Sequence, residues 1–368
     1  MAKSTKKRII VSVTNDLVTD NRVHKICTSL YKLGFDVLLV GRKLPHSADV
    51  IRNYPTRRIK LIFKKGPGFY AEYNIRLFLL LLFAKCDILL SDDLDSLPAN
   101  YLASRCKAKT LVYDSHEYFT QVPELVNRPP TQKIWEWVER KILPKVKYAY
   151  TVCNSIANVY RKKYGVDFKV LRNLPLAQKA QAVQTSSDTR MILYQGAVNV
   201  GRGLEQAILA MHYIDDAKLV IAGDGDIRTQ LEELVAKEKL ENKVEFKGRL
   251  PLEDLSKLTV QADLGLSIEE DLGLNYRYTL PNKLFDYIQA RVPVLVSDLP
   301  EMAAIVTQYK VGTITPSLEP KVLAENILDA LNDQAKRKVW KTYLKVAAAD
   351  LIWENEEQVL KELFAPFL

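Results

Sequence analysis

The sequence has few cysteines and no long apolar run. Four cysteines, Cys27, Cys86, Cys106 and Cys153, occur among 368 residues. No two are close enough for a zinc knuckle or a redox motif, so we expect reduced thiols. The longest apolar run, residues 77–84, is far shorter than the roughly 20 residues that cross a bilayer. These absences argue against a disulfide scaffold, a cysteine-based metal site and a membrane-spanning protein.

No secretory signal is visible in the first residues either, so we expect no leader. Lys6, Lys7 and Arg8 precede a short apolar run, residues 9–13, that has no small-residue cleavage site after it. We therefore expect a cytoplasmic protein whose first buried strand begins near Ile9. The composition is 48% hydrophobic and 26% charged, which is ordinary for a globular protein, and 368 residues suggest two domains.

The net charge of +9 is divided unequally along the chain. Residues 1–172 carry 31 Lys+Arg against 15 Asp+Glu, a net of +16, whereas residues 173–368 carry 22 against 29, a net of −7. A basic half suits an anionic surface, such as lipid headgroups, a lipid pyrophosphate or nucleic acid. No recognised nucleic-acid motif is present, so we expect no nucleic-acid partner.

Short apolar runs alternate with helical patterns throughout, which predicts an α/β fold with parallel sheets. A polar stretch, Gln178–Thr189, follows the break near Asn173 and resembles a linker. We expect two Rossmann-like domains, residues 1–172 and 173–349, with a C-terminal helix, 350–368, that packs back on the first. The predicted strands are Ile9–Thr14, Asp36–Gly41, Ile59–Phe63, Asp87–Ser91, Thr110–Tyr113, Tyr148–Val152, Met191–Gln195, Lys218–Ala222, Lys243–Lys247, Ala262–Ile268, Val292–Ser297 and Val311–Ile314.

The segment Leu280–Tyr287 is the most informative for chemistry. Pro281 suits the first position of a helix, whose N-terminus attracts phosphate. Lys283 and Asp286 are three residues apart and share a face, so the lysine could grip a diphosphate and the aspartate a ribose. The alternative is an amphipathic helix on which both residues face water.

Glycine-rich turns follow two later strands. Gly196–Gly203 lets a backbone approach a ligand closely, and Arg202 within it could bind phosphate. Its glycine spacing is not that of the dinucleotide fingerprint, so a plain strand-to-helix turn is an equal reading. The second turn, Gly223–Asp226, reads as structural.

Polar residues also follow strands in the first half. Asp114–Glu117 comes at the carboxyl end of a strand, where ligands of open α/β sheets lie, and His116 could orient a sugar hydroxyl. Asp93 and Asp95 form a D-x-D pair that could hold a divalent ion. We expect a loop and a helix cap there, and no metal site.

Together these residues resemble the GT-B glycosyltransferases, specifically retaining glycosyltransferase family 4. The resemblance covers nearly the whole chain and is most specific in the second half. The segments that carry it are Leu280–Tyr287 with Ala290–Glu301, Gly196–Gly203, Val220–Gly225, Val244–Gly248, Ala262–Ser267, Val18–Val23, Asp114–Glu117 and Asn154-Ser155.

The resemblance implies two domains that face each other across a cleft and roles for individual residues. Arg202 and Lys283 would clamp the donor diphosphate, and Asp286 would hold its ribose. Gly201 and Asn282 would complete the donor site, and His116 would be the active-site histidine. The acceptor-side residues would be Asp20, Arg22 and Glu117.

Three departures from the family pattern concern the sugar contacts. Ala197 stands where the family often has arginine, and Tyr278 stands where its first paired glutamate would be. Glu269 or Glu270 would substitute for that glutamate, or nothing does. The second glutamate of the pair is Asp286, which is one methylene shorter.

The activity implied is transfer of a sugar from a nucleotide-sugar, with retention and without a cofactor or metal. The acceptor would be a glycan or a lipid-linked molecule of a surface-polysaccharide or glycolipid pathway. The charge division adds an expectation of peripheral binding to the inner, anionic face of the cell membrane. A GT-B sugar-nucleotide epimerase and a non-catalytic nucleotide-sugar-binding subunit are the alternatives.

Overall fold

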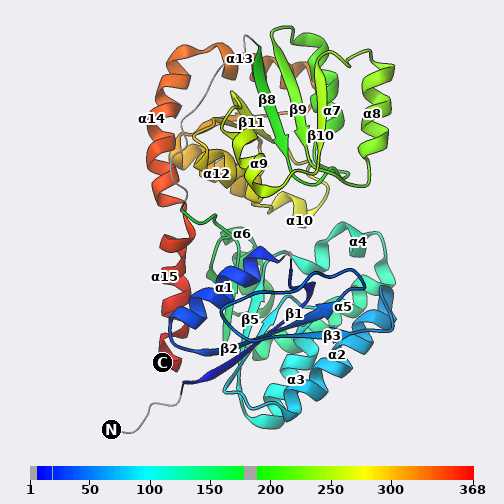
Figure 1. Cartoon of the computed structure of the whole chain (residues 1–368), viewed down its shortest axis with the longest axis vertical. Coiled ribbons are helices and arrows are strands. Elements are labelled where there is room, and N and C mark those ends of the chain that lie inside the picture. Colours follow the sequence, from blue (N-terminus) through cyan, green and yellow to red (C-terminus); the bar gives the residue numbers. More distant parts are fainter. Residues whose placement is uncertain (1–5, 19, 178–188) are drawn as a thin grey trace. The chain divides into compact units, whose positions relative to one another are not determined.

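The computed structural model describes residues 6–18, 20–177 and 189–368, so the predicted linker lies almost wholly outside the described residues. The chain forms two compact units, residues 1–173 with 356–368 and residues 174–355. Each unit is a parallel sheet with helices on its faces (Figure 1).

The first unit contains a seven-stranded sheet in the order β3-β2-β1-β4-β5-β6-β7. Every strand pair is parallel. The central strands are apolar and buried because helices cover both faces of the sheet. The strands are β1 (Arg8–Asp16), β2 (Asp36–Lys43), β3 (Thr56–Lys60), β4 (Ile88–Asp92), β5 (Thr110–Ser115), β6 (Tyr148–Thr151) and β7 (Lys169–Val170).

Most helices of the first unit begin with a side-chain cap or with a proline in their first two residues. Asp20 caps α1 by accepting a hydrogen bond from the Val23 amide at 3.0 Å. Phe364 of α15 packs edge-on against Phe35, with ring centroids 5.9 Å apart. The helices are α1 (Asn21–Lys32), α2 (Gly66–Phe83), α3 (Leu97–Lys107), α4 (Pro123–Val126), α5 (Pro129–Ile142), α6 (Asn154–Tyr164) and α15 (Trp353–Phe364).

The second unit contains a six-stranded parallel sheet in the order β10-β9-β8-β11-β12-β13. Its strands are β8 (Arg190–Gln195), β9 (Ala217–Ala222), β10 (Val244–Gly248), β11 (Leu264–Ser267), β12 (Val294–Ser297) and β13 (Gly312–Thr315). Its helices are α7 (Leu204–Ala210), α8 (Arg228–Lys237), α9 (Leu252–Thr259), α10 (Leu274–Arg277), α11 (Asn282–Gln289), α12 (Pro300–Tyr309), α13 (Pro320–Asn332) and α14 (Gln334–Asp350).

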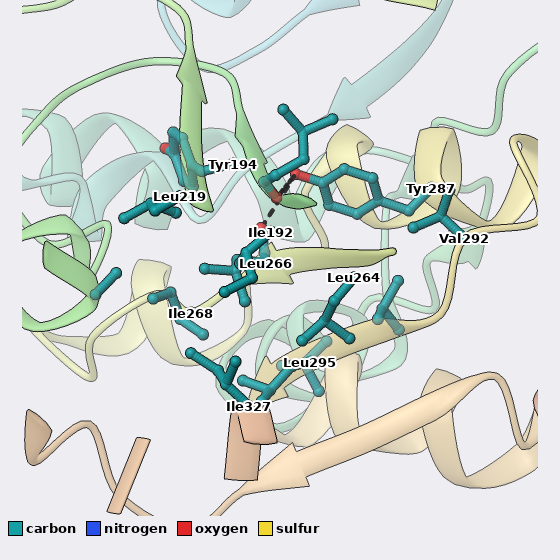
Figure 2. Packing of buried hydrophobic residues seen from close by; sticks show 14 of the residues in the cluster. Ile192, Tyr194, Leu219, Leu264, Leu266, Ile268, Tyr287, Val292, Leu295 and Ile327 are labelled. Atoms are coloured by element: carbon teal, nitrogen blue, oxygen red, sulfur yellow. Dashed lines mark hydrogen bonds between the residues drawn. The ribbon is translucent and has the colours of Figure 1, made fainter. Parts of the chain in front are cut away.

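The core of the second unit ties α11 to the sheet. Leu264, Leu266 and Leu295 are fully buried between the strands and α13 (Figure 2). The buried Tyr287 hydroxyl of α11 donates to the Leu193 carbonyl at 3.0 Å. The Tyr287 hydroxyl also lies 3.3 Å from the Leu266 carbonyl oxygen, so it holds α11 beside β8 and β11 and positions the side chains at the first turn of α11.

Three sequence predictions differ in detail from the structure. Strand β3 covers Thr56–Lys60, not Ile59–Phe63, because the apolar Ile62 and Phe63 are exposed beyond its end. The two-residue β7 was not predicted. Pro281 is the residue before α11, not its first residue. Across the described part of the chain, no helix has the length and hydropathy needed to span a membrane.

Candidate functional site

The second sheet changes direction between β8 and β11. The chain proceeds outward through β9 and β10 and then returns to place β11 on the other side of β8. In open α/β sheets, ligands bind beyond the carboxyl ends of the two strands at such a switch point. The residues at those ends are Gln195, the last residue of β8, the loop from Gly196 to Gly203, and Ile268–Glu269 after β11.

The loop after β8 makes two close backbone contacts that are possible only because a glycine forms each of them. Gly203 has a φ of +68°, and a Cβ there would lie 2.2 Å from the Ile268 carbonyl oxygen. A Cβ on Gly223 would lie 1.8 Å from the Gly196 carbonyl oxygen. The glycines of both turns therefore let the loop after β8 pack against its neighbours, which fixes its course.

Lys283 lies inside this site and does not face water. Its side chain is 8% exposed, and its Nζ donates to Glu269 Oε1 at 2.8 Å. The ammonium also lies 4.0 Å from the ring centroid of Tyr194, a cation–π contact. The reading of α11 as a helix with Lys283 in solvent is therefore wrong.

Arg202 approaches the same carboxylate from the loop after β8. Its NH1 lies 3.5 Å from Glu269 Oε1, and its guanidinium lies 5.4 Å from the Tyr276 ring centroid. Its Nε is buried and has no hydrogen-bond partner among the described residues. Two cations from separate segments thus converge beside the switch point.

The charge of Glu269 is sustained by these cations. Burial raises the pKa of this carboxyl, but Lys283 and Arg202 lower it more, so the pKa of Glu269 lies below its usual value. Ser267 adds a hydrogen bond at 2.9 Å. Glu269 is therefore an anion in the folded protein despite being completely buried.

Asp286 lies one turn along α11 and is partly exposed. Its Oδ2 accepts a hydrogen bond from Gln195 Nε2 at 3.0 Å, and Gln195 Oε1 accepts one from Thr259 at 2.7 Å. Gln195 is thereby fixed in one amide orientation that presents its donor to the carboxylate. Asn282 is exposed at the start of the same helix, and Gly201 is buried against Leu272 and Tyr276.

Glu269 does not offer a free carboxylate in place of the first glutamate of the family's pair. That side chain has no exposed surface and is committed to Lys283, Arg202 and Ser267. Glu270 is half-buried. Burial raises its pKa above the usual value, and the nearby charge of Glu205 raises it further. Tyr278 is partly exposed at the end of α10.

In the first unit, His116 lies between two aspartates. Its Nε2 is 2.9 Å from Asp93 Oδ2 and its Nδ1 is 3.5 Å from Asp92 Oδ1. Burial lowers the pKa of His116, but Asp93 and Asp92 raise it well above its usual value. The histidine is therefore an imidazolium whose two nitrogens both face carboxylates. This limits its capacity to hydrogen-bond a sugar hydroxyl.

Acidic residues gather at this edge of the first sheet. Asp92 is buried, and neither of its oxygens has a hydrogen-bond partner among the described residues. Burial raises the pKa of Asp114 to about 6 and that of Glu117 to about 7. Asp95 accepts a hydrogen bond from Thr14, and its pKa is raised by burial. Within the described residues, no group of three or more histidines, cysteines or acids could hold a metal ion.

The two other acceptor-side candidates have structural partners. Arg22 is 6% exposed and donates to both oxygens of Asp114, at 2.8 and 3.3 Å, and to the Leu171 carbonyl at 3.3 Å. Asp20 caps α1 and accepts a hydrogen bond from Asn15. Arg22 thus holds β5 and the segment after β7 together, and its guanidinium has little freedom to bind a substrate.

Two family models match the chain and together account for most of it. The model described as glycosyltransferase family 4 matches residues 20–174, and the one described as glycosyl transferases group 1 matches residues 177–346. The chain therefore belongs to the GT-B glycosyltransferases of family 4, as the resemblance predicted.

Individual relatives share less than a third of their aligned residues with this chain. An uncharacterized glycosyltransferase of Methanocaldococcus jannaschii is 29% identical over 177 residues, which are 44% of this chain and 43% of that protein. The sucrose-phosphate synthase of Thermosynechococcus elongatus has a TM-score of 0.81 at 17% identity, over 98% of this chain and 100% of that one. Anabaena HepE in complex with UDP-glucose has a TM-score of 0.72 at 14% identity, over 98% and 100%. These structures show the shared fold.

The sequence interpretation did not identify Tyr194 or Gln195 and left the role of Glu269 open. All three lie at the carboxyl ends of β8 and β11. Their position at the end of β8 or directly after β11 is the signal that could have identified them, because polar groups at that edge line the ligand site of such sheets.

Proposed function

We propose that this protein transfers a sugar from a nucleotide-sugar to a hydroxyl acceptor with retention, and that Lys283 and Arg202 bind the donor diphosphate. The observation that carries the proposal is the convergence of these two cations at the switch point of the second sheet. Family membership supports the reaction class.

The reaction needs stabilisation of negative charge on the leaving diphosphate. An ammonium, a guanidinium and the N-terminus of α11 lie along one edge of the sheet, and all three favour phosphate oxygens. Fixed donors aimed at developing charge are the largest single contribution in many enzymes. Asp286, oriented by Gln195, would accept the ribose hydroxyls.

The first unit would hold the acceptor through the edge formed by β1, β4 and β5. His116 and Asp93 form an ion pair there, and Glu117 titrates near neutral pH, so a hydroxyl acceptor meets carboxylate oxygens that accept hydrogen bonds. Asp20 and Arg22 would contribute by holding this edge in shape, given their partners. The UDP-glucose bound to HepE supports a uridine nucleotide as the first donor to test.

Nucleoside diphosphate should bind without a divalent metal, because Lys283 and Arg202 supply the positive charge that a metal would otherwise supply. Isothermal titration of UDP, GDP and ADP in EDTA, and again in excess Mg²⁺, measures this. We expect the same dissociation constant in both buffers for the nucleotide that binds. Binding that disappears in EDTA would contradict the proposal and favour a metal held by Asp93 and Asp95.

We also propose that the first unit binds an anionic membrane surface on the cytoplasmic side and takes a lipid-linked acceptor. The support is a face formed by edge strand β3, the segment after it and α2, here called the β3–α2 face. Two adjoining hollows of about 410 and 610 Å³ lie on it and share Lys60. Their cationic lining comprises Arg42, Lys43, Arg57, Arg58, Lys60, Lys64 and Arg76.

Several of these cations form no ion pair with any residue that the structure describes. Arg57, Lys60 and Lys64 are exposed and form no ion pair among the described residues. Beside them, Phe83 is 83% exposed and Ile62 is 75% exposed. Uncompensated cations next to exposed apolar side chains are typical of proteins that lie on anionic lipid.

Only one side of α2 could supply apolar contacts to a membrane. Tyr73, Leu77 and Leu81 are fully buried in the first unit, so they do not reach a membrane. Ile75, Leu79 and Phe83 lie on the exposed side of the helix. Elsewhere, Arg161 pairs with Asp167 and Lys163 with Glu139, so these two cations are less available to lipid than the cations of the β3–α2 face that form no ion pair.

A further inference from the structure

A buried carboxylate lies where a diphosphate site is expected to be purely positive. Glu269 follows β11, and none of its surface is exposed. Its Oε1 accepts from Lys283 Nζ at 2.8 Å and lies 3.5 Å from Arg202 NH1, while Ser267 Oγ donates to its Oε2 at 2.9 Å. One carboxylate therefore contacts both cations assigned to the diphosphate.

Without an anion between them, these two cations would repel each other. The repulsion of unit charges a few ångströms apart is substantial at the effective dielectric near a protein surface. Lys283 is on α11 and Arg202 is on the loop after β8, so the two side chains come from separate segments of the chain. The contacts with Glu269 fix the two cation positions relative to each other.

We propose that Glu269 is a positioning residue: it holds Lys283 and Arg202 at the convergence point where they meet the leaving diphosphate. This inference rests on the proposed function. Glu269 itself touches no substrate because it is completely buried beneath the two cations. Tyr194 supports the same arrangement by supplying a ring surface 4.0 Å from the ammonium.

A positioning role predicts a particular separation of kinetic effects. Glu269→Gln keeps the side-chain shape and removes the charge. The trio then has one more net positive charge, so ground-state binding of UDP should not weaken. The cations lose their fixed positions, however, so turnover should fall, since a small misplacement of catalytic groups can cost about 100-fold.

The experiment uses UDP in calorimetry and UDP-glucose hydrolysis for turnover. For Glu269→Gln we expect a UDP dissociation constant equal to or lower than that of the wild type and a kcat at least about 10-fold lower. Glu269→Asp, which retains the charge, should recover part of kcat. Glu325→Gln, an exposed glutamate on α13, is the matched control and should change neither value.

Two results would overturn the inference. The first is an unchanged kcat in Glu269→Gln. The second is a parallel loss of kcat and of UDP affinity together with a lower melting temperature, which indicates a purely structural residue. Absence of UDP binding and UDP-glucose hydrolysis in the wild type would instead count against the proposed donor.

A crystal structure of Glu269→Gln tests the positioning role without any nucleotide. We expect the Lys283 ammonium and the Arg202 guanidinium to move apart from their convergence point. Side chains that stay in place in the variant, with Lys283 still over the Tyr194 ring, would contradict the role of Glu269 whatever the reaction proves to be.

Discussion

Replacing Lys283 with methionine should lower kcat/KM by about 100- to 1,000-fold, the loss typical when one donor to a developing anion is removed. Methionine retains the aliphatic volume beside Tyr194 and Gly196 but removes the ammonium. Arg202→Ala should have an effect of the same kind, about 2–4 kcal/mol of transition-state stabilisation. Steady-state kinetics with the nucleotide-sugar that the wild type uses provides the measurement.

The burial of Lys283 requires a stability control for this variant. Its removal leaves the buried Glu269 with Arg202 and Ser267 as partners, and a buried charge that loses a partner destabilises a protein. Melting temperature and circular dichroism must therefore show that the variant is folded at the assay temperature. Lys321→Met, at an exposed site on α13, is the matched control. A folded Lys283→Met variant with near wild-type turnover would contradict the diphosphate assignment.

Removing three cations from the β3–α2 face should abolish most binding to anionic vesicles. Each cation near an anionic surface contributes about 1 kcal/mol, so the triple variant Arg57→Ala, Lys60→Ala, Lys64→Ala should lose roughly 100-fold in partition coefficient. These three residues form no ion pair in the described structure, so the fold should be unaffected. Co-sedimentation with phosphatidylserine-containing vesicles over a salt series provides the measurement.

The control for the membrane experiment is a triple variant elsewhere on the chain. Lys338, Lys341 and Lys345 are exposed on α14, and their replacement by alanine removes the same net charge. That variant should bind vesicles almost as the wild type does, and wild-type binding should weaken with salt. Equal, negligible sedimentation of the wild type with anionic and neutral vesicles would contradict the membrane proposal.

The sequence was a good guide to the fold because many of its strands contain a short, buried apolar run. Parallel strands covered on both faces have that pattern, and β1, β4 and β12 follow it. The pattern misplaced β3, whose residues are mostly charged: the apolar pair Ile62-Phe63 lies beyond the edge strand and is exposed. Apolar composition alone does not distinguish a buried strand from an exposed binding face.

The site was less predictable because its contacts join distant segments. Lys283 was recognised as a candidate cation, but its burial depends on Glu269, on Tyr194 and on the course of the loop after β8. Arg22 pairs with Asp114 across 92 positions of sequence, which a local motif cannot reveal. His116 followed a strand as expected, and the two aspartates that flank it come from β4 and the residue after it.

The central claim, catalysis of sugar transfer with retention, is tested most directly by following a nucleotide-sugar to its product. The protein is incubated in EDTA with UDP-glucose, GDP-mannose and related donors, and the anomeric proton of the released or transferred sugar is read by NMR before mutarotation. We predict release of the nucleoside diphosphate and a first-formed sugar with the anomeric configuration of the donor. An inverted product would contradict retention, a donor epimerised at C2 would indicate an epimerase, and binding without any turnover would indicate a non-catalytic subunit.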